Sequence, residues 1–481
     1  MAPPRFNFNL ILWLLSAGLL LRLLLAYVIL PSSGLVGDLG AYTNWAITLV
    51  NVGPGEFYDS AGFADYPPGY LYVLWLIGTI SKGIVSITGA DIGTVVTHLL
   101  KIPPIFLDIF SGFMLYATAR NWCTDKPRAE RVALTAAAIY LFNPVTWYDS
   151  AIWGQTDAAG ACVILMALVS LTRWPSEVTA SVAALACLIK PQFGVILTPL
   201  VGIVLLKRHI LPQKQIPATD LVEKALPDRS NGALRLLCSS IVGLLVFYAL
   251  ITPFNLSLHA FIERMTATAQ LYHFLSVNAY NPWAFVGSGD TQALVFGSIG
   301  AWSRDDIPLI GSLKGVEIGS TLLLLGILAG IARLLWRADR WSIASVGVFL
   351  SMCFFILPTR VHERYIFSAF AFLPLLAAFD RKWLWATLAL TFASFINLHG
   401  VLTVEFHGTP NVISLPLGEF CRSPTAIITS TVLHTAVFLF SIWKLWPDTV
   451  FSAASKPNSA ASRAPFADTA DVEHFNSVER R

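Results

Sequence analysis

The stretch NLILWLLSAGLLLRLLLAYVIL (9–30) is followed directly by PSSGLVGDLGAYTNWA (31–46), so a long apolar segment ends just before a carboxylate. A membrane-spanning helix needs about 20 apolar residues to cross roughly 30 Å of hydrocarbon, and the first segment has that length. It is longer than the core of a signal peptide, so we expect a retained signal anchor. Asp38 is then expected just outside the membrane.

The same apolar character extends through most of the 481 residues. Hydrophobic residues make up 55% of the chain and charged residues 13%, and the mean hydropathy is +0.65. These values exclude an ordinary soluble domain. Besides the first segment, spans are expected at 101–119, 132–148, 157–173, 178–206, 233–253, 316–335, 341–357, 365–379, 383–398 and 425–445. The sequence therefore predicts an all-α polytopic membrane protein with about 12 (roughly 11–13) transmembrane helices.

The charged loops predict which side of the membrane each span end faces, because Lys and Arg near span ends are retained in the cytoplasm during insertion. The basic loops, all expected inside, are 120–131, 207–235, 333–340 and 380–382. Segment 31–69 contains no Lys or Arg and four carboxylates, so we expect it outside. The polar clusters expected at that same outer level are WGQTD (153–157), KPQ (190–192), NAYNPW (278–283) and RVHERY (360–365).

Two segments need special treatment for this arrangement to hold. Counting 70–88 as a span would place the basic loop 120–131 outside, so we expect 70–88 to lie along the outer interface or re-enter it. Segment 178–206 would reach roughly 44 Å as a single helix. We therefore expect two short helices that meet at Lys190-Pro191.

The predicted domain organisation is simple. Residues 1–446 are expected to form one membrane-embedded domain, in which 31–100 is the first outer loop and contains interfacial helices. The polar segment 447–481 is expected to be a disordered cytoplasmic tail. There is no internal sequence repeat, which disfavours a transporter built from duplicated halves.

WGQTD is the strongest local signal for a binding site. Trp153, Gln155 and Asp157 open a span that begins with small residues, and polar side chains entering an apolar helix are costly without a partner. An aromatic face combined with amide and carboxylate groups suits a sugar. The ordinary alternatives are an interfacial Trp and an Asp that caps a helix.

Asp38 is the candidate general base, because a carboxylate near an acceptor hydroxyl can take its proton as a glycosidic bond forms. A solvated loop carboxylate is the ordinary alternative. Tyr42 and Trp45 follow it and are assigned to sugar or acceptor binding. Asp65, in FADYPPGYLY, is a second carboxylate with the same assignment, although a turn role before Pro67 is the alternative.

Cations at the same level are candidates for holding a phosphate leaving group, whose charge needs such donors. They are Lys190, Arg360, His362 and Arg364. For the arginines the alternative is contact with lipid headgroups. For His362, which is next to Glu363, the alternative is a structural histidine paired with that carboxylate. Lys190 is harder to explain as structural, because an ammonium followed by proline in an apolar stretch leaves charge and backbone groups to be used.

Asn278, Asn281 and Trp283 lie in the long outer loop 254–315 and are further candidates for lining the site. An Asx turn is the ordinary alternative for the asparagines. All three are assigned to sugar or acceptor binding.

Two deeper charges are expected to be structural. Arg22 lies inside the first span and Asp108 lies within FLDIF of the span that begins near Lys101. Because an unpaired charge at that depth is costly, we expect Arg22 and Asp108 to form a buried pair.

The order of these motifs resembles a known family. GD-x₃-Y-x₂-W after the first span, YPPGYLY, K-x₆-D from Lys101 to Asp108, NP before WGQTD, KPQ, N-x₂-N-x-W and HERY are similar to bacterial relatives of the GPI mannosyltransferases, within the GT-C superfamily of lipid-phosphate-sugar-dependent glycosyltransferases. The resemblance covers about residues 20–380. It implies a GT-C-like helical fold with a long first outer loop, a polyprenyl-phosphate sugar as donor, and an acidic base in that loop at the position of Asp38.

By the same resemblance, HERY and KPQ would bind near the donor phosphate and WGQTD would shape the sugar pocket. The first loop departs from the family because it has no Asp-x-Asp or adjacent Asp-Glu pair, and no metal or cofactor is assigned.

The residues together with this resemblance imply a membrane hexosyltransferase, mannosyltransferase-like, that acts at the outer face of a bacterial cytoplasmic membrane on a cell-envelope glycan. The expected partners are the lipid donor, a glycan, lipid or protein acceptor, and membrane lipids, with no nucleic acid. A polytopic transporter or lipid flippase without catalysis is the rival, and it would place polar groups near the bilayer midplane. A ligase or polymerase using a diphosphate-linked oligosaccharide is a third possibility.

Overall fold

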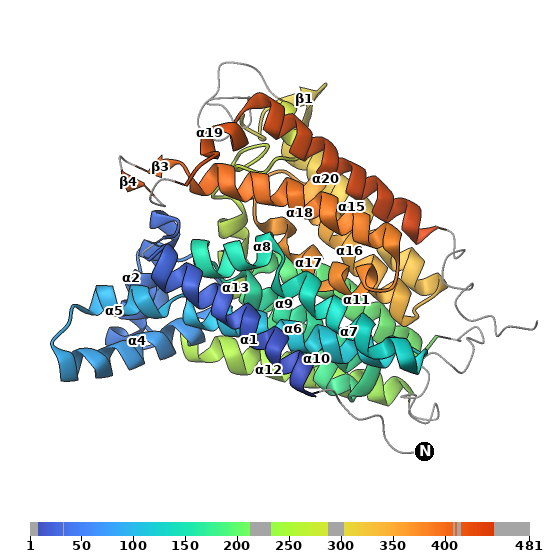
Figure 1. The fold of residues 1–481 in the computed structure, drawn as a ribbon, viewed down its shortest axis with the longest axis horizontal. Helices are drawn as coiled ribbons and strands as arrows, with labels where there is room; N and C mark the ends of the chain where they lie inside the picture. Colours follow the sequence, from blue (N-terminus) through green and yellow to red (C-terminus); the bar gives the residue numbers. More distant parts are fainter. Residues whose placement is uncertain are drawn as a thin grey trace, which may run out of the picture. The chain divides into compact units, whose positions relative to one another are not determined.

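The computed structural model describes residues 8–31, 33–211, 232–286, 303–406, 409–410 and 415–446. Helices make up almost all of its regular structure (Figure 1). In chain order the elements are α1 (Phe8–Leu24), π-helix η1 (Leu25–Ile29), α2 (Val36–Val52), α3 (Phe57–Ser60), α4 (Pro68–Thr88), α5 (Ile92–Leu99), α6 (Ile102–Trp122), α7 (Lys126–Leu141), α8 (Pro144–Trp147), π-helix η2 (Tyr148–Trp153), α9 (Asp157–Arg173), α10 (Ser176–Ile189), α11 (Pro191–His209), α12 (Gly232–Ile251), η4 (Thr252–Phe254), α13 (Leu258–Ala269), η5 (Pro282–Phe285), β1 (Pro308–Ile310), β2 (Leu313–Lys314), α15 (Gly315–Trp336), α16 (Arg340–Ile356), η6 (Tyr365–Ser368), α17 (Ala369–Ala377), α18 (Arg381–Leu402), β3 (Glu405–Phe406), β4 (Thr409–Pro410), α19 (Gly418–Cys421) and α20 (Pro424–Leu445). The strands form two short antiparallel pairs, β1–β2 and β3–β4.

Many of these helices are suited to a bilayer. Within the described ranges, the segments long and apolar enough to cross a membrane are Asn9–Ile29, Pro68–Thr88, Ile92–Trp122, Pro191–His209, Gly232–Phe254, Gly315–Trp336, Arg381–Leu402 and Pro424–Leu445. Shorter apolar helices are Ser176–Ile189, Arg340–Ile356 and Tyr365–Ala377. The all-α polytopic membrane class is therefore confirmed, while the count of about 12 spans stays a prediction.

The break predicted within 178–206 is confirmed. α10 ends at Ile189, α11 begins at Pro191, and Lys190 between them is extended, with φ −154° and ψ 146°. Proline disfavours the helical conformation at the residue that precedes it, which explains the position of the break. The Lys190 side chain therefore leaves the chain at the junction of two helices.

The continuous span predicted for 132–148 is wrong. α7 ends at Leu141, and the Asn143 side chain accepts a hydrogen bond of 2.9 Å from the Val145 amide to begin α8. Pro144 explains the interruption, because it disfavours helical geometry at the residue before it. π-helix η2 follows, and Gly154, with φ +80°, ends it. This irregular segment leads WGQTD into the bundle.

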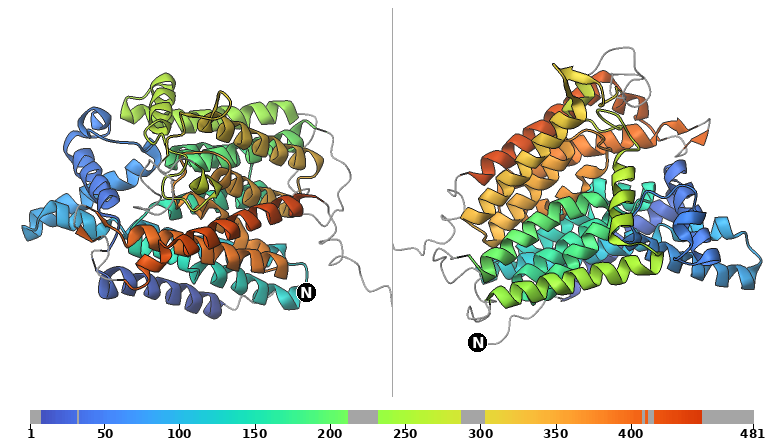
Figure 2. Two further views of the ribbon diagram at one scale, coloured as in Figure 1. Left: turned by 90° about the horizontal axis from the view of Figure 1, so that it is seen from above. Right: turned by 180° about the vertical axis from the view of Figure 1, so that it is seen from behind.

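The first outer loop is helical, as expected for interfacial helices. α2, α4 and α5 lie at one end of the bundle, and α4 and α5 project beyond it (Figures 1 and 2). α4 packs closely on α2, since a Cβ added at Gly78 would lie 2.3 Å from the Ala46 carbonyl oxygen. Their placement along the membrane interface remains a prediction, as does the tail 447–481, which lies outside the described residues.

The expected pair of buried charges is present. Arg22 Nε lies 2.9 Å from Asp108 Oδ2, and both side chains are fully buried. Arg22 also donates to the Leu141 carbonyl at 2.8 Å. The hydroxyls of Tyr140 and Ser150 donate to Asp108 at 2.8 and 2.6 Å. The pair therefore ties α1 to α6, to the end of α7 and to the irregular segment before WGQTD.

Candidate functional site

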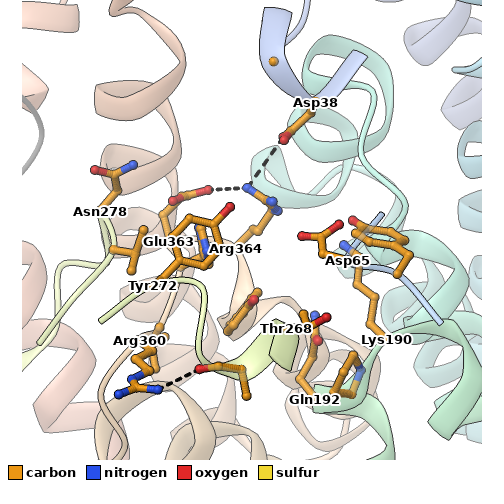
Figure 3. A pocket seen from close by; sticks show the side chains of 18 of the residues that line it. Asp38, Asp65, Lys190, Gln192, Thr268, Tyr272, Asn278, Arg360, Glu363 and Arg364 are labelled. Atoms are coloured by element: carbon orange, nitrogen blue, oxygen red, sulfur yellow. Dashed lines mark hydrogen bonds and ion pairs between the residues drawn. The ribbon is translucent and has the colours of Figure 1, made fainter. Parts of the chain in front are cut away.

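A cavity of about 640 Å³ lies where α2, the loop before α4, the α10–α11 junction, α13 and the loop after α16 meet (Figure 3). These segments are far apart in the sequence and each contributes polar side chains. The predicted site residues that line the cavity are Asp38, Tyr42, Trp45, Asp65, Lys190, Asn278, Arg360, His362 and Arg364. The structure therefore brings the base candidate and all four candidate cations to this one cavity.

Asp38 lies in the first turn of α2, with 22% of its side chain exposed. Trp153 Nε1 donates to Asp38 Oδ2 at 3.0 Å, and Gln155 Nε2 donates to the same oxygen. Arg364 lies 3.7 Å from that oxygen. Asp38 is thus a held carboxylate at the cavity wall and not a freely solvated loop residue.

Lys190 is buried and paired. Its Nζ lies 2.9 Å from Asp157 Oδ2 and donates to Gln155 Oε1 at 3.3 Å. The ammonium also lies 5.2 Å from the centre of the Tyr66 ring, within the range of a cation–π contact. The extended backbone at the helix junction places this charge on the cavity wall.

Arg364 contacts three carboxylates. Its guanidinium lies 2.7 Å from Glu363 Oε1, 3.7 Å from Asp38 Oδ2 and 4.0 Å from Asp157 Oδ2. It also lies 5.8 Å from the Trp153 ring centre. Figure 3 shows Arg364 between Asp38 and Glu363. This side chain therefore connects the base candidate with the HERY segment.

The WGQTD side chains do not line the cavity. Trp153, Gln155 and Asp157 are fully buried and lie behind its wall, where they bind Asp38 and Lys190. Direct stacking of a sugar on Trp153 does not fit this arrangement, because the ring is covered by the protein and by Arg364. Their contribution to a site runs through the residues that they hold.

Two other predicted residues also lie away from the cavity. Asn281 is buried and donates to the Phe355 carbonyl at 2.9 Å, and Trp283 donates to the Leu357 carbonyl at 3.0 Å. Both carbonyls belong to the end of α16, where backbone acceptors lack partners within the helix. Asn281 and Trp283 therefore close a helix end, and the expectation that they contact a ligand does not fit. Asn278 does line the cavity, with a left-handed φ of +64°.

Arg360 lines the cavity but is already engaged. It forms a two-pronged contact with buried Asp305, at 2.7 and 3.1 Å, and donates to the Ala269 carbonyl at 2.9 Å. Such bidentate pairs fix geometry. Arg360 is therefore better placed to hold the HERY loop against the segment after α13 than to bind a phosphate.

Burial shifts the pKa of three lining groups. It raises the pKa of Asp65 to about 6, and it raises the pKa of Glu363. Burial, with Arg364 and Lys190 nearby, holds the pKa of His362 well below its ordinary value. His362 therefore stays neutral, so it can donate a hydrogen bond but supplies no charge to a phosphate.

Several lining residues were not assigned to the site from the sequence. Glu363, Tyr66, Gln192 and Tyr272 line the cavity. Glu363 and Gln192 belong to HERY and KPQ, so the motifs signalled them, and Tyr66 lies in the segment before α4. Tyr272 packs edge-on against His362 with ring centres 4.8 Å apart, and no sequence signal marked it. In the part of the chain that the structure describes, no cluster of three His, Cys, Asp or Glu residues has the geometry to hold a metal.

One family model matches slightly less than half of the chain. Residues 49–286 match the family described as GPI transamidase subunit PIG-U. The family resemblance drawn from the motifs is confirmed to that extent. The matched region contains Asp65 and Lys190 but ends before HERY and begins after Asp38.

One solved structure to which the chain is similar is ArnT from Cupriavidus metallidurans bound to undecaprenyl phosphate. The TM-score is 0.42 at 14% sequence identity, and the alignment covers 91% of this chain and 77% of that chain. No curated protein sequence matches the chain.

Proposed function

We propose that this protein is a membrane glycosyltransferase that moves a hexose from a polyprenyl-phosphate sugar to an acceptor hydroxyl. One observation supports this most directly: a single cavity has Asp38 on its wall together with two cations, buried Lys190 and Arg364, whose side chain is 11% exposed. A carboxylate can accept a proton, and fixed cations can stabilise a departing phosphate. The cavity thus offers a candidate for each half of a transfer site.

The reaction follows from these roles. Asp38 takes the proton of the acceptor hydroxyl, and the hydroxyl oxygen forms a bond to the anomeric carbon. The bond between that carbon and the phosphate oxygen breaks, and the phosphate leaves with the bonding electrons. Attack from the face opposite the phosphate inverts the configuration. General base catalysis of this kind contributes about 10²- to 10⁴-fold.

Arg364 and Lys190 are assigned to the leaving phosphate. Lys190 is held by Asp157, while Arg364 has a hydrogen bond to Glu363 and longer ion-pair distances to Asp38 and Asp157. Arg364 Nε has no hydrogen-bond partner among the described residues. That nitrogen is buried and lies 4.0 Å from Asp157 Oδ2, so a phosphate would meet the rest of the guanidinium.

The proposed setting is the outer face of a bacterial cytoplasmic membrane. The basic loops predicted inside and the acidic first loop predicted outside support this orientation. An acceptor from the cell envelope is then accessible to the cavity. Mannose as the transferred sugar rests only on the family resemblance.

The test is transfer of radiolabelled sugar from a panel of polyprenyl-phosphate sugars, with membrane extract as acceptor. The wild-type protein is expected to transfer label. Asp38→Asn keeps the size of the side chain but removes the base, so it should insert, bind the donor and lose turnover. Full activity of Asp38→Asn would move the role of base to Asp65.

A second candidate function is supported by the match of residues 49–286 to a GPI transamidase subunit family. In that case the cavity would bind a lipid-linked glycan without transferring its sugar, as one subunit of an assembly. Saturable binding of a polyprenyl-phosphate sugar with no transfer from any donor, by protein shown to be folded, would favour this candidate. Movement of the lipid across reconstituted vesicles would instead favour a flippase.

A further inference from the structure

The donors to Asp38 converge on one of its two carboxylate oxygens. Trp153 Nε1, Gln155 Nε2 and the guanidinium of Arg364 all approach Oδ2. Among the described residues, none donates a hydrogen bond to Oδ1. The two oxygens of the proposed base are therefore not equivalent, because one is held and the other is available.

The hydrogen bonds behind Gln155 have a single possible direction. Gln155 Oε1 carries no hydrogen, so it accepts from Tyr42 at 2.8 Å and from Lys190 at 3.3 Å. This orientation leaves the amide nitrogen to donate to Asp38. The only hydroxyl hydrogen of Tyr42 points to Gln155, so Tyr42 must accept from Tyr66, whose hydroxyl lies 2.6 Å away. The chain of donors runs from Tyr66 through Tyr42 and Gln155 to Asp38.

The local sequence explains why these groups meet. Tyr42 follows Asp38 by four residues on α2, so both lie on the same face of that helix. Gly154, with φ +80°, separates Trp153 from Gln155 and turns the chain. The amides of Gly154 and Gln155 both donate to one backbone carbonyl at 3.0 Å, which fixes this turn. Both side chains are thereby held against the carboxylate.

We propose that Tyr66, Tyr42, Gln155 and Trp153 form a positioning network for the base. The network holds Asp38 by Oδ2 and leaves Oδ1 to take the acceptor proton. This inference rests on the proposed transferase function and assigns WGQTD a role other than sugar contact. Trp153 and Gln155 are fully buried and lie outside the cavity lining, so they would affect the rate through Asp38 and not through contact with the substrate.

The most informative variant is Tyr42→Phe, because it keeps the ring at the cavity wall and removes one hydroxyl. Without that donor the Gln155 amide is free to rotate, and small displacements of a catalytic group cost up to about 100-fold in rate. We expect kcat to fall about 10- to 100-fold with an unchanged KM for the lipid donor. Tyr280→Phe is the matched control, because Tyr280 is equally buried and its hydroxyl donates to the Cys421 carbonyl at 3.0 Å. It should keep kcat within about twofold.

A second variant separates positioning from general damage. If Tyr42 acts only through Gln155, the double variant Tyr42→Phe/Gln155→Leu should be no slower than Gln155→Leu alone, since residues in one network are not additive. Two results would overturn the network while leaving the transferase proposal intact. One is a double variant whose fold loss in kcat equals the product of the two single losses, and the other is full kcat in Tyr42→Phe. No transfer by folded wild-type protein would overturn the transferase proposal and the network's role together.

Discussion

The packing of α4 on α2 controls where the proposed base lies, and one substitution tests this. A Cβ added at Gly78 would lie 2.3 Å from the Ala46 carbonyl oxygen and 3.1 Å from its carbon. A close carbon–oxygen contact is about 3.3 Å or longer, so Gly78→Ala must separate the two helices by roughly 1 Å. Overpacking of this kind costs about 1–3 kcal/mol of stability. Because α2 carries Asp38, a shift of that size should also lower kcat by up to about 100-fold.

Gly83→Ala is the control on the same helix. A Cβ at Gly83 would have no heavy atom within 4 Å, and alanine favours a helix over glycine by up to about 1 kcal/mol. Thermal unfolding in detergent and sugar transfer should both be measured. Gly83→Ala should keep or raise the unfolding temperature with normal transfer, whereas Gly78→Ala should lower both. Equal behaviour of the two variants would refute the close packing of α4 on α2.

Three further predictions follow from buried charges. Arg22→Met or Asp108→Leu alone should lower the free energy of unfolding by about 3–5 kcal/mol, because each leaves an unpaired charge. The double variant should lose less stability than the sum of the two single losses. Additive losses in thermal unfolding would contradict the pair. Burial raises the pKa of Asp65 from 3.8 to about 6, so its protonated form favours folding, and this contribution is lost as the pH rises through about 6. At about 1.36 kcal/mol per pKa unit, wild type should lose up to about 3 kcal/mol relative to Asp65→Asn between pH 4 and 7.5; parallel stability curves would exclude this. Asp305→Asn should raise the KM for the lipid donor, because it loosens Arg360 and the HERY loop. Transfer rates at varied donor concentration measure this KM. An unchanged KM would mean that Asp305 does not influence donor binding.

Much of the site could be predicted from sequence because polar residues in an apolar chain are costly and rarely incidental. Lys190 is predicted in this way, whereas Asp38 is predicted from its place in an outer loop without Lys or Arg and from the family resemblance. The proline after Lys190 also predicted the helix break that places its side chain on the cavity wall. The Arg22–Asp108 pair followed from the same reasoning, since two buried opposite charges need each other.

The direction in which each polar side chain points could not be predicted. Asn281 and Trp283 satisfy carbonyls at the end of α16, and the sequence does not reveal which distant helix end needs donors. Trp153 lies at the end of a π-helix, whose side chains do not follow the ordinary helical repeat. Only the folded chain shows that Trp153 lies behind the cavity wall and not in it.

The charges around Arg364 explain how one site could serve both halves of the proposed transfer. Before reaction, Asp38 is charged and the donor phosphodiester has one negative charge. Afterwards Asp38 holds the acceptor proton and the leaving phosphate has two negative charges, so the total charge of the site is unchanged. Because Arg364 lies 3.7 Å from Asp38 Oδ2, negative charge leaves one neighbour of the guanidinium as it builds on the phosphate. Loss of Arg364 should therefore impair the chemical step more than it impairs donor binding, in contrast to loss of Asp305.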